Sequence, residues 1–143
     1  MIIVVDANVV VSSLIAKGVP FNIFLLNRLL KKFEFVAPEF MLTEFEKHKE
    51  RLLKEAKLPK DEFNELAKFL FEEINLVPAS QFSELLPPAR ASLTTHQKDA
   101  PYLALALKLK CPIFSGDKTL IRLSPVKVFS PRELLEKLLR AEE

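Results

Sequence analysis

The chain opens with a short apolar run that strongly limits what it can fold into. Residues 1–5 read MIIVV, and the run ends at Asp6. A continuous β-branched run without polar alternation is typical of a strand that is buried on both faces in a parallel sheet. Parallel strands need crossover connections, which are usually helices that cover the sheet. The sequence therefore predicts an α/β protein with residues 1–5 as its central strand.

Helical and strand patterns alternate along the rest of the chain. Apolar residues recur at helical spacing in three segments, at residues 20–33, 39–57 and 59–75. The last two predict a helical hairpin. Shorter apolar runs predict four more strands, at residues 34–38, 76–78, 111–114 and 126–129.

Local signals define the remaining segments. Residues 87–95, rich in Pro, Ser and Thr, predict a surface loop with a short helix. Asp99 can cap a helix that follows it, and Ser130 and Glu133 form a capping box for a last helix that runs to about Arg140. Alternating strands and helices imply right-handed crossovers. We therefore predict a three-layer α/β/α sandwich around a parallel sheet of four to five strands.

Length and composition fit one domain over residues 1–143. About half of the 143 residues are apolar and 28% are charged, which suits a folded core. Uncharged stretches are much shorter than the roughly 20 residues that a bilayer requires, so we expect no membrane span. A single cysteine, Cys111, allows no internal disulfide. We expect a soluble, cytoplasmic protein.

Composition also excludes two nucleotide-binding motifs. Only two glycines, Gly18 and Gly116, occur in the chain, so neither a Rossmann fingerprint nor a Walker A loop can be present. Lys and Arg number 21 against 19 Asp and Glu, for a formal net charge of +2. This balance argues neither for nor against a nucleic-acid partner.

Three aspartates fall where a parallel sheet gathers its ligands. Asp6 and Asp117 each follow an apolar run, and Asp99 begins the helix that leads into the second run. Singly, each is more often a turn former or a helix cap. Together, carboxylates about 4 Å apart repel by roughly 4 kcal/mol per pair at a dielectric near 20, so a cluster needs protons or a cation. Oxygen ligands favour Mg²⁺ or Mn²⁺, and we see no His or Cys grouping that would suit zinc.

Three stretches of sequence carry a more specific signal. Residues 4–9 read VVDANV, residues 98–107 read KDAPYLALAL, and residues 112–120 read PIFSGDKTL. The first resembles the opening strand and first metal-binding Asp of the PIN-domain nucleases, and the other two resemble the C-terminal half of that family. The chain thus resembles a PIN-domain nuclease of the type often encoded as the toxin of a toxin–antitoxin pair. The resemblance covers essentially the whole chain, with only general similarity in the middle helices and residues 87–95.

The resemblance implies a set of four acidic residues that bind metal and are catalytic. These acids are Asp6, Glu44, Asp99 and Asp117. Glu44 has other glutamates nearby, but the sequence LTE at residues 42–44 fits the family pattern best.

Polar neighbours of the acids also match the family. Asn8 and Ser115 occupy positions where members place side chains that orient the acids or the metal-bound water, although Asn is also a turn former and Ser is common at strand ends. Some members carry a further acid just after the last motif. This chain has Thr119 there, which implies a weakly held second metal.

The implied activity is that of an endoribonuclease, which hydrolyses phosphodiester bonds of single-stranded RNA with Mg²⁺ or Mn²⁺ as cofactor. Lys98, Lys118 and Arg122 are the predicted RNA contacts, and Lys17 and His96 also lie beside the acidic motifs, although each could equally be solvated surface charge. The resemblance further implies a homodimer and a small antitoxin protein that plugs the acidic groove.

Three alternatives remain open at this point. A metal-dependent phosphatase of the haloacid dehalogenase type also begins with an apolar strand ending in Asp, but it needs a second Asp where this chain has Asn8. A receiver-like domain needs paired acids after the first strand. A catalytically silent PIN fold could serve as an RNA- or protein-binding module, and the presence of all four acids counts against it.

Overall fold

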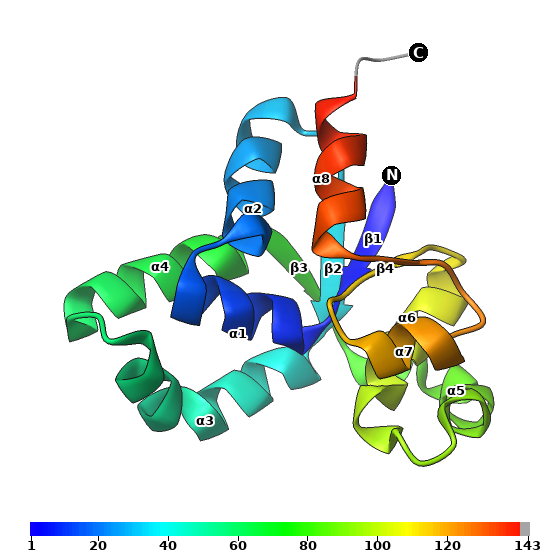
Figure 1. Cartoon of the computed structure of the whole chain (residues 1–143). Coiled ribbons are helices and arrows are strands. Elements are labelled where there is room, and N and C mark those ends of the chain that lie inside the picture. Colours follow the sequence, from blue (N-terminus) through cyan, green and yellow to red (C-terminus); the bar gives the residue numbers. More distant parts are fainter. Residues whose placement is uncertain (141–143) are drawn as a thin grey trace.

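The apolar run at the start of the chain forms β1 (Ile2–Val5), the central strand of a parallel sheet (Figure 1). Ile3, Val4 and Val5 are fully buried, as expected for a strand that is covered on both faces. In the computed structural model, which describes residues 1–140, the strand order is β3-β2-β1-β4-β5 and all neighbours are parallel. The predicted fold class is confirmed. The other strands are β2 (Glu34–Pro38), β3 (Ile74–Val77), β4 (Ile113–Phe114) and β5 (Val128–Phe129).

Helices flank this sheet. α6 (Ala100–Leu109) packs against β1 and β2, and α5 (Leu86–Leu93) packs against α6. α2 (Val19–Leu30) contacts α1 (Ala7–Ala16) and α8 (Pro131–Leu139), and these three helices lie together in Figure 1. The remaining helices are α3 (Phe40–Ala56), α4 (Lys60–Glu72) and α7 (Lys118–Leu123), with short 3₁₀ turns η1 (Ala79–Gln81), η2 (Ser83–Leu85) and η3 (Gln97–Asp99).

The order of the strands makes β1 a switch point in the sheet. The chain runs from β1 outward through β2 to β3, then returns past β1 to β4 and continues to β5. Right-handed crossovers in opposite directions place their helices on opposite faces of the sheet. A crevice therefore opens at the carboxyl ends of β1 and β4, where the connections leave in opposite directions.

An aromatic cluster attaches α2 to the sheet below this crevice. The ring of Phe24 on α2 lies 5.1 Å from the ring of Phe35 on β2 and 6.1 Å from the ring of Phe114 on β4. Phe35 and Phe114 are themselves 6.1 Å apart, and all three side chains are buried. Such ring pairs add to the free energy gained by burying apolar area. The cluster bridges the strands on both sides of β1 and so fixes their relative position.

The structure differs from the sequence prediction between β1 and β2. The prediction of one helix over residues 20–33 misses α1, which begins directly after Asp6. The sequence of α1, ANVVVSSLIA, is rich in β-branched residues of low helix propensity, and burial of residues such as Val9 and Leu14 overrides that propensity. Within the described residues no single helix is long and apolar enough to cross a membrane. By length and composition α1 and α2 would suffice only as a pair, and the chain bends by 101° between them.

Several boundaries also shift. The helix predicted for residues 59–75 ends at Glu72, and the strand predicted for residues 76–78 begins at Ile74. Ile74 fits both the helical repeat and a strand, and its parallel pairing with Phe35 assigns it to β3. β4 and β5 are two-residue strands, shorter than predicted, and α7 is an additional helix that sequence analysis did not find.

A buried amide joins α2 to β2. Asn27 is 5% exposed, and its Nδ2 donates a hydrogen bond to the carbonyl of Phe33 over 2.9 Å. Its Oδ1 accepts from the backbone N–H groups of Lys32 and Phe33 over 3.1 and 3.0 Å. The side chain therefore satisfies three backbone groups in the turn that leads into β2.

Replacing Asn27 with Ala should lower the free energy of unfolding by about 2–4 kcal/mol, because three backbone groups lose a partner in a largely buried turn. Chemical denaturation measures this change. Asn22→Ala, on the exposed side of the same helix, serves as the matched control and should change stability by less than about 0.5 kcal/mol. Equal stability of the two variants would contradict a structural role for the Asn27 amide.

Candidate metal centre

The register between β1 and β4 fixes the position of Asp6. Val5 pairs with Phe114, so the residues that follow them, Asp6 and Ser115, lie side by side at the edge of the sheet. The Asp6 N–H donates to the Phe114 carbonyl over 3.0 Å, and Ser115 Oγ donates to Asp6 Oδ2 over 2.7 Å. Asp6 precedes α1 but makes no capping hydrogen bond with its side chain. Its buried carboxylate is therefore held by the neighbouring strand.

Asp117 uses its two carboxylate oxygens differently. Oδ1 accepts hydrogen bonds from the N–H groups of Thr119 and Leu120 over 2.9 and 3.2 Å, which caps α7. Oδ2 lies 2.9 Å from His96 Nε2. The Asp117 N–H donates to Ser115 Oγ over 3.0 Å, so one serine contacts both aspartates. The cap orients the carboxylate and leaves Oδ2 directed toward the site.

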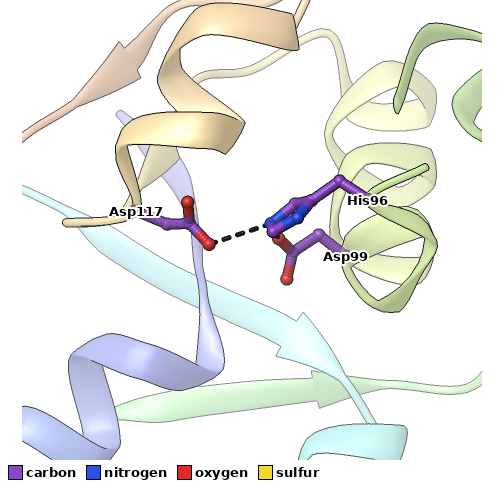
Figure 2. Close-up of side chains that lie close together, drawn as sticks. All are labelled: His96, Asp99 and Asp117. Atoms are coloured by element: carbon purple, nitrogen blue, oxygen red, sulfur yellow. Dashed lines mark hydrogen bonds and ion pairs between the residues drawn. The ribbon is translucent and has the colours of Figure 1, made fainter. Parts of the chain in front are cut away.

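Asp99 comes from the opposite layer, at the junction of η3 and α6. It is 5% exposed and makes no capping hydrogen bond with its side chain. Figure 2 shows its carboxylate beside His96 and facing Asp117, with His96 Nε2 2.7 Å from Asp99 Oδ2. The three side chains offer ligand atoms that all lie within 4.8 Å of one another.

His96 is the member of this cluster that sequence reasoning missed. The sequence indicates it only as a phosphate contact beside the acidic motifs, and its place within the cluster emerges from the structure. The available signal was the spacing of three residues between His96 and Asp99, which brings two side chains together over one helical turn. The distance in sequence to Asp117 concealed the third member of the cluster.

A cavity of about 300 Å³ opens beside the aspartates. All four predicted acids line it, with Glu44 half-buried on α3. Much of the remaining wall is apolar and comes from α1 and α3, while His48 and Arg51 add polar groups farther along α3. The cavity therefore has acidic side chains in one part of its wall and apolar side chains over much of the rest.

Of the other predicted site residues, Asn8 and Lys98 line the cavity and the rest do not. Asn8 lines the cavity, and its Oδ1 lies 3.5 Å from Ser115 Oγ and accepts from the Gly116 N–H over 3.4 Å. Lys98 also lines the cavity.

The remaining basic candidates lie outside the cavity lining. Lys118 and Arg122 are exposed on α7. Lys17 follows the last residue of α1, about 15 Å along that helix from the acids.

Burial and mutual repulsion shift the pKa values of the aspartates at the site. Burial, together with the charges of Asp99 and Asp117, raises the pKa of Asp6 to about 7 against the hydrogen bond from Ser115. Burial also raises the pKa of Asp99, which the nearby charge of Asp117 reinforces and His96 opposes. Burial alone would raise the pKa of Asp117, but hydrogen bonds from His96 and the α7 backbone outweigh it and lower the pKa. Without a cation, the site therefore holds protons near neutral pH.

Among residues 1–140, two buried polar atoms at the site have no hydrogen-bond partner, namely Asp99 Oδ2 and the hydroxyl of Tyr102. Tyr102 lines the same cavity and is buried, and burial together with the charges of Asp6, Asp99 and Glu44 raises its pKa. Unpartnered buried polar groups are rare in proteins and call for a missing partner. A hydrated divalent cation would supply a ligand bond to the first atom and water to the second, so these residues fit such an ion.

Asp6→Asn should stabilise the metal-free protein at pH 8 and leave its stability unchanged near pH 4. The Asp6 pKa is about 7 when folded against an ordinary 3.8, so burial of the charge opposes folding increasingly as the pH rises from 4 to 7. A shift of about three units corresponds to at most about 4 kcal/mol. Thermal unfolding in EDTA measures the difference. Asp61→Asn, on the surface of α4, should show no gain at pH 8, and an equal gain in both variants would refute the assignment.

Comparisons with known proteins agree with this geometry. A sequence profile described as the PIN domain matches residues 4–138. The chain is similar in structure to a chain in the crystal structure of VapBC2 from Rickettsia felis bound to a DNA fragment from their promoter, with a TM-score of 0.68 and 12% sequence identity over 91% of this chain and 98% of that one. No curated protein sequence matches it significantly. With a profile match over nearly the whole length and the matching fold, the chain belongs to the PIN-domain family.

Proposed function

We propose that the protein is an endoribonuclease that hydrolyses phosphodiester bonds in single-stranded RNA with Mg²⁺ or Mn²⁺. Members of the PIN-domain family are generally nucleases, and the family match extends over residues 4–138. The observation that carries the proposal is the convergence of Asp6, Asp99 and Asp117 at the switch point of the sheet, with Glu44 lining the same cavity. Four acids around one cavity offer hard oxygen ligands and no covalent nucleophile, which suits metal-assisted hydrolysis.

The four acids would hold the metal. When bound, a divalent ion lowers the pKa of a coordinated water and offsets the charge of the substrate phosphate. Ser115 keeps Asp6 in place through its 2.7 Å hydrogen bond, and the cap of α7 leaves Asp117 Oδ2 facing His96, where it would be free to bind the ion. Asn8, in contact with Gly116, can orient a water at the same edge. These groups are fixed before substrate arrives, which lowers the reorganisation that catalysis requires.

Basic residues near the acids can position RNA. Lys98 lines the cavity directly before Asp99, so its ammonium group can meet a phosphate that approaches the acids. Lys118 and Arg122 are exposed on α7, whose first turn is capped by Asp117. Contacts of this kind fix the phosphate backbone without reading sequence. The surface around the acids thus favours a polyanion once a cation neutralises them.

Partners and location follow as further parts of the proposal. The resemblance to toxin components in sequence and the structural similarity to a VapBC2 chain support a small antitoxin protein that plugs the acidic groove. We also propose a homodimer, a single domain over residues 1–143 and a cytoplasmic location. A phosphatase of the haloacid dehalogenase type is less favoured, because Asn8 stands where that class needs an acid and instead contacts the β4 end of the sheet.

The direct test is cleavage of a fluorescent single-stranded RNA by the purified protein. We expect cleavage with Mg²⁺ or Mn²⁺ and none with EDTA. Asp99→Asn should lower the cleavage rate at least 100-fold, because it removes a metal ligand. That factor corresponds to about 3 kcal/mol of transition-state stabilisation. Asp61→Asn, prepared identically, should retain full activity. Equal residual cleavage in both variants would indicate a contaminating nuclease, and an inactive wild type with every RNA tested would favour a silent binding module.

The assignment of Glu44 has its own test, because several glutamates share α3. Glu44→Gln should reduce cleavage at least tenfold, since Glu44 lines the cavity and a lost ligand weakens the metal. Glu46→Gln, two residues along the same helix and exposed, should keep activity within about twofold. A comparison of initial rates at a metal concentration that only half-saturates the wild type separates these outcomes. If the Glu46 variant is the impaired one, the fourth acid has been assigned to the wrong residue.

A further inference from the structure

We propose that His96 binds the divalent ion directly through Nε2 and makes the site prefer Mn²⁺ over Mg²⁺. The inference rests on the proposed metal-dependent function but concerns a residue outside the four acids. It is carried by the positions of three atoms, namely His96 Nε2 and the Oδ2 atoms of Asp99 and Asp117. None of these positions depends on the RNA substrate.

The distances from His96 Nε2 to the two carboxylate oxygens match the spacing of metal ligands, and ligand atoms of all three residues lie within 4.8 Å of one another. Bonds from such ions to nitrogen and oxygen are about 2.1 Å long, so two ligands at right angles lie about 3.0 Å apart. His96 Nε2 lies 2.7 Å from Asp99 Oδ2 and 2.9 Å from Asp117 Oδ2. An ion on the cavity side of these atoms would need little movement from any of them.

Hydrogen bonds from His96 cannot satisfy the carboxylate oxygens of both Asp99 and Asp117. A ring nitrogen carries at most one hydrogen, so Nε2 can donate to only one of the two carboxylates, and of the two contacts only the one with Asp117 has hydrogen-bond geometry. Asp99 Oδ2, although 2.7 Å from the same nitrogen and in a 95% buried residue, then receives no hydrogen bond from any residue that the structure describes. A cation bound by both oxygens and by the deprotonated nitrogen would satisfy all three atoms. The unpartnered oxygen therefore points to an ion rather than to a purely structural histidine.

The segment that carries His96 is held in place. The His96 N–H donates to the carbonyl of Leu93 at the end of α5 over 2.9 Å. The side chain of the next residue, Gln97, donates through Nε2 to the carbonyls of Arg90 and Thr94. These bonds anchor the turn before Asp99, so the imidazole is positioned before metal binds.

A nitrogen ligand changes which ion the site selects. Mg²⁺ is a hard ion that keeps oxygen ligands and several waters, whereas imidazole binds transition metals more readily. Four carboxylates alone would accept either ion. With imidazole added, we expect the site to bind Mn²⁺ more tightly than Mg²⁺ by a larger factor than the acids alone would give.

Pulsed electron paramagnetic resonance of bound Mn²⁺ tests the bond itself. The metal-stripped protein loaded with Mn²⁺ should show a coupling to ¹⁴N, and labelling with ¹⁵N-histidine should replace it with a ¹⁵N signal. His96→Gln should abolish the coupling and weaken Mn²⁺ binding about tenfold by calorimetry, with a smaller effect on Mg²⁺. His48→Gln is the matched control, since the chain has only these two histidines and His48 lines the cavity beside the acids.

Several results would overturn the inference. Bound Mn²⁺ without nitrogen coupling in the wild type excludes the ligand, and this measurement needs no variant to fold. Tighter Mn²⁺ binding by His96→Gln would show that the ring competes with the ion, and loss of coupling in His48→Gln would assign the ligand elsewhere. No Mn²⁺ binding at all would refute both the inference and the proposed function. Nitrogen coupling without RNA cleavage would keep His96 as a ligand and refute only the ribonuclease.

Discussion

The parallel pairing of β1 with β4 is the interaction on which the candidate site depends. Because Val5 pairs with Phe114, Asp6 and Ser115 emerge together, and Asp117 follows two residues later. A shift of one residue in the pairing of β1 with β4 would turn the side chains of the shifted strand to the opposite face of the sheet. The rings of Phe24 on α2, Phe35 on β2 and Phe114 on β4 pack together across β1 and oppose such a shift. Part of the apolar core thus sets the register of a polar site.

The acids at this edge work against folding unless something neutralises them. Asp6 is 2% exposed and faces the charges of two other aspartates, and burial with these charges raises its pKa to about 7. Native proteins tolerate such unfavourable clusters mainly where they serve a function. His96 reduces the repulsion by contacting two of the acids, but it leaves one buried oxygen without a partner. The donor atoms of the cluster therefore fit a cation, which would neutralise the acids and satisfy that oxygen.

Sequence reasoning found the sheet, its central strand and the three aspartates from local pattern, whereas Glu44 came only from the family resemblance. An apolar run followed by Asp defines the end of a strand wherever the strand lies in the sheet. α1 escaped detection because its β-branched sequence contradicts its helical state, which only packing enforces. His96 escaped as a site residue because its relation to Asp117 is set by the meeting of α6 and β4, over 21 residues of sequence. The chemical roles of the acids remain predictions that geometry alone does not test.

The divided carboxylate of Asp117 links the integrity of a helix to the chemistry beside it. Its Oδ1 caps the N-terminus of α7, which carries Lys118 and Arg122, while its Oδ2 contacts His96. An alanine at this position would therefore remove a charge, release the first turn of α7 and displace two basic side chains together. A null phenotype from such a mutation in a genetic screen would not distinguish among these causes. Only an amide, which keeps the capping oxygen, would separate the electrostatic contribution from the architectural one.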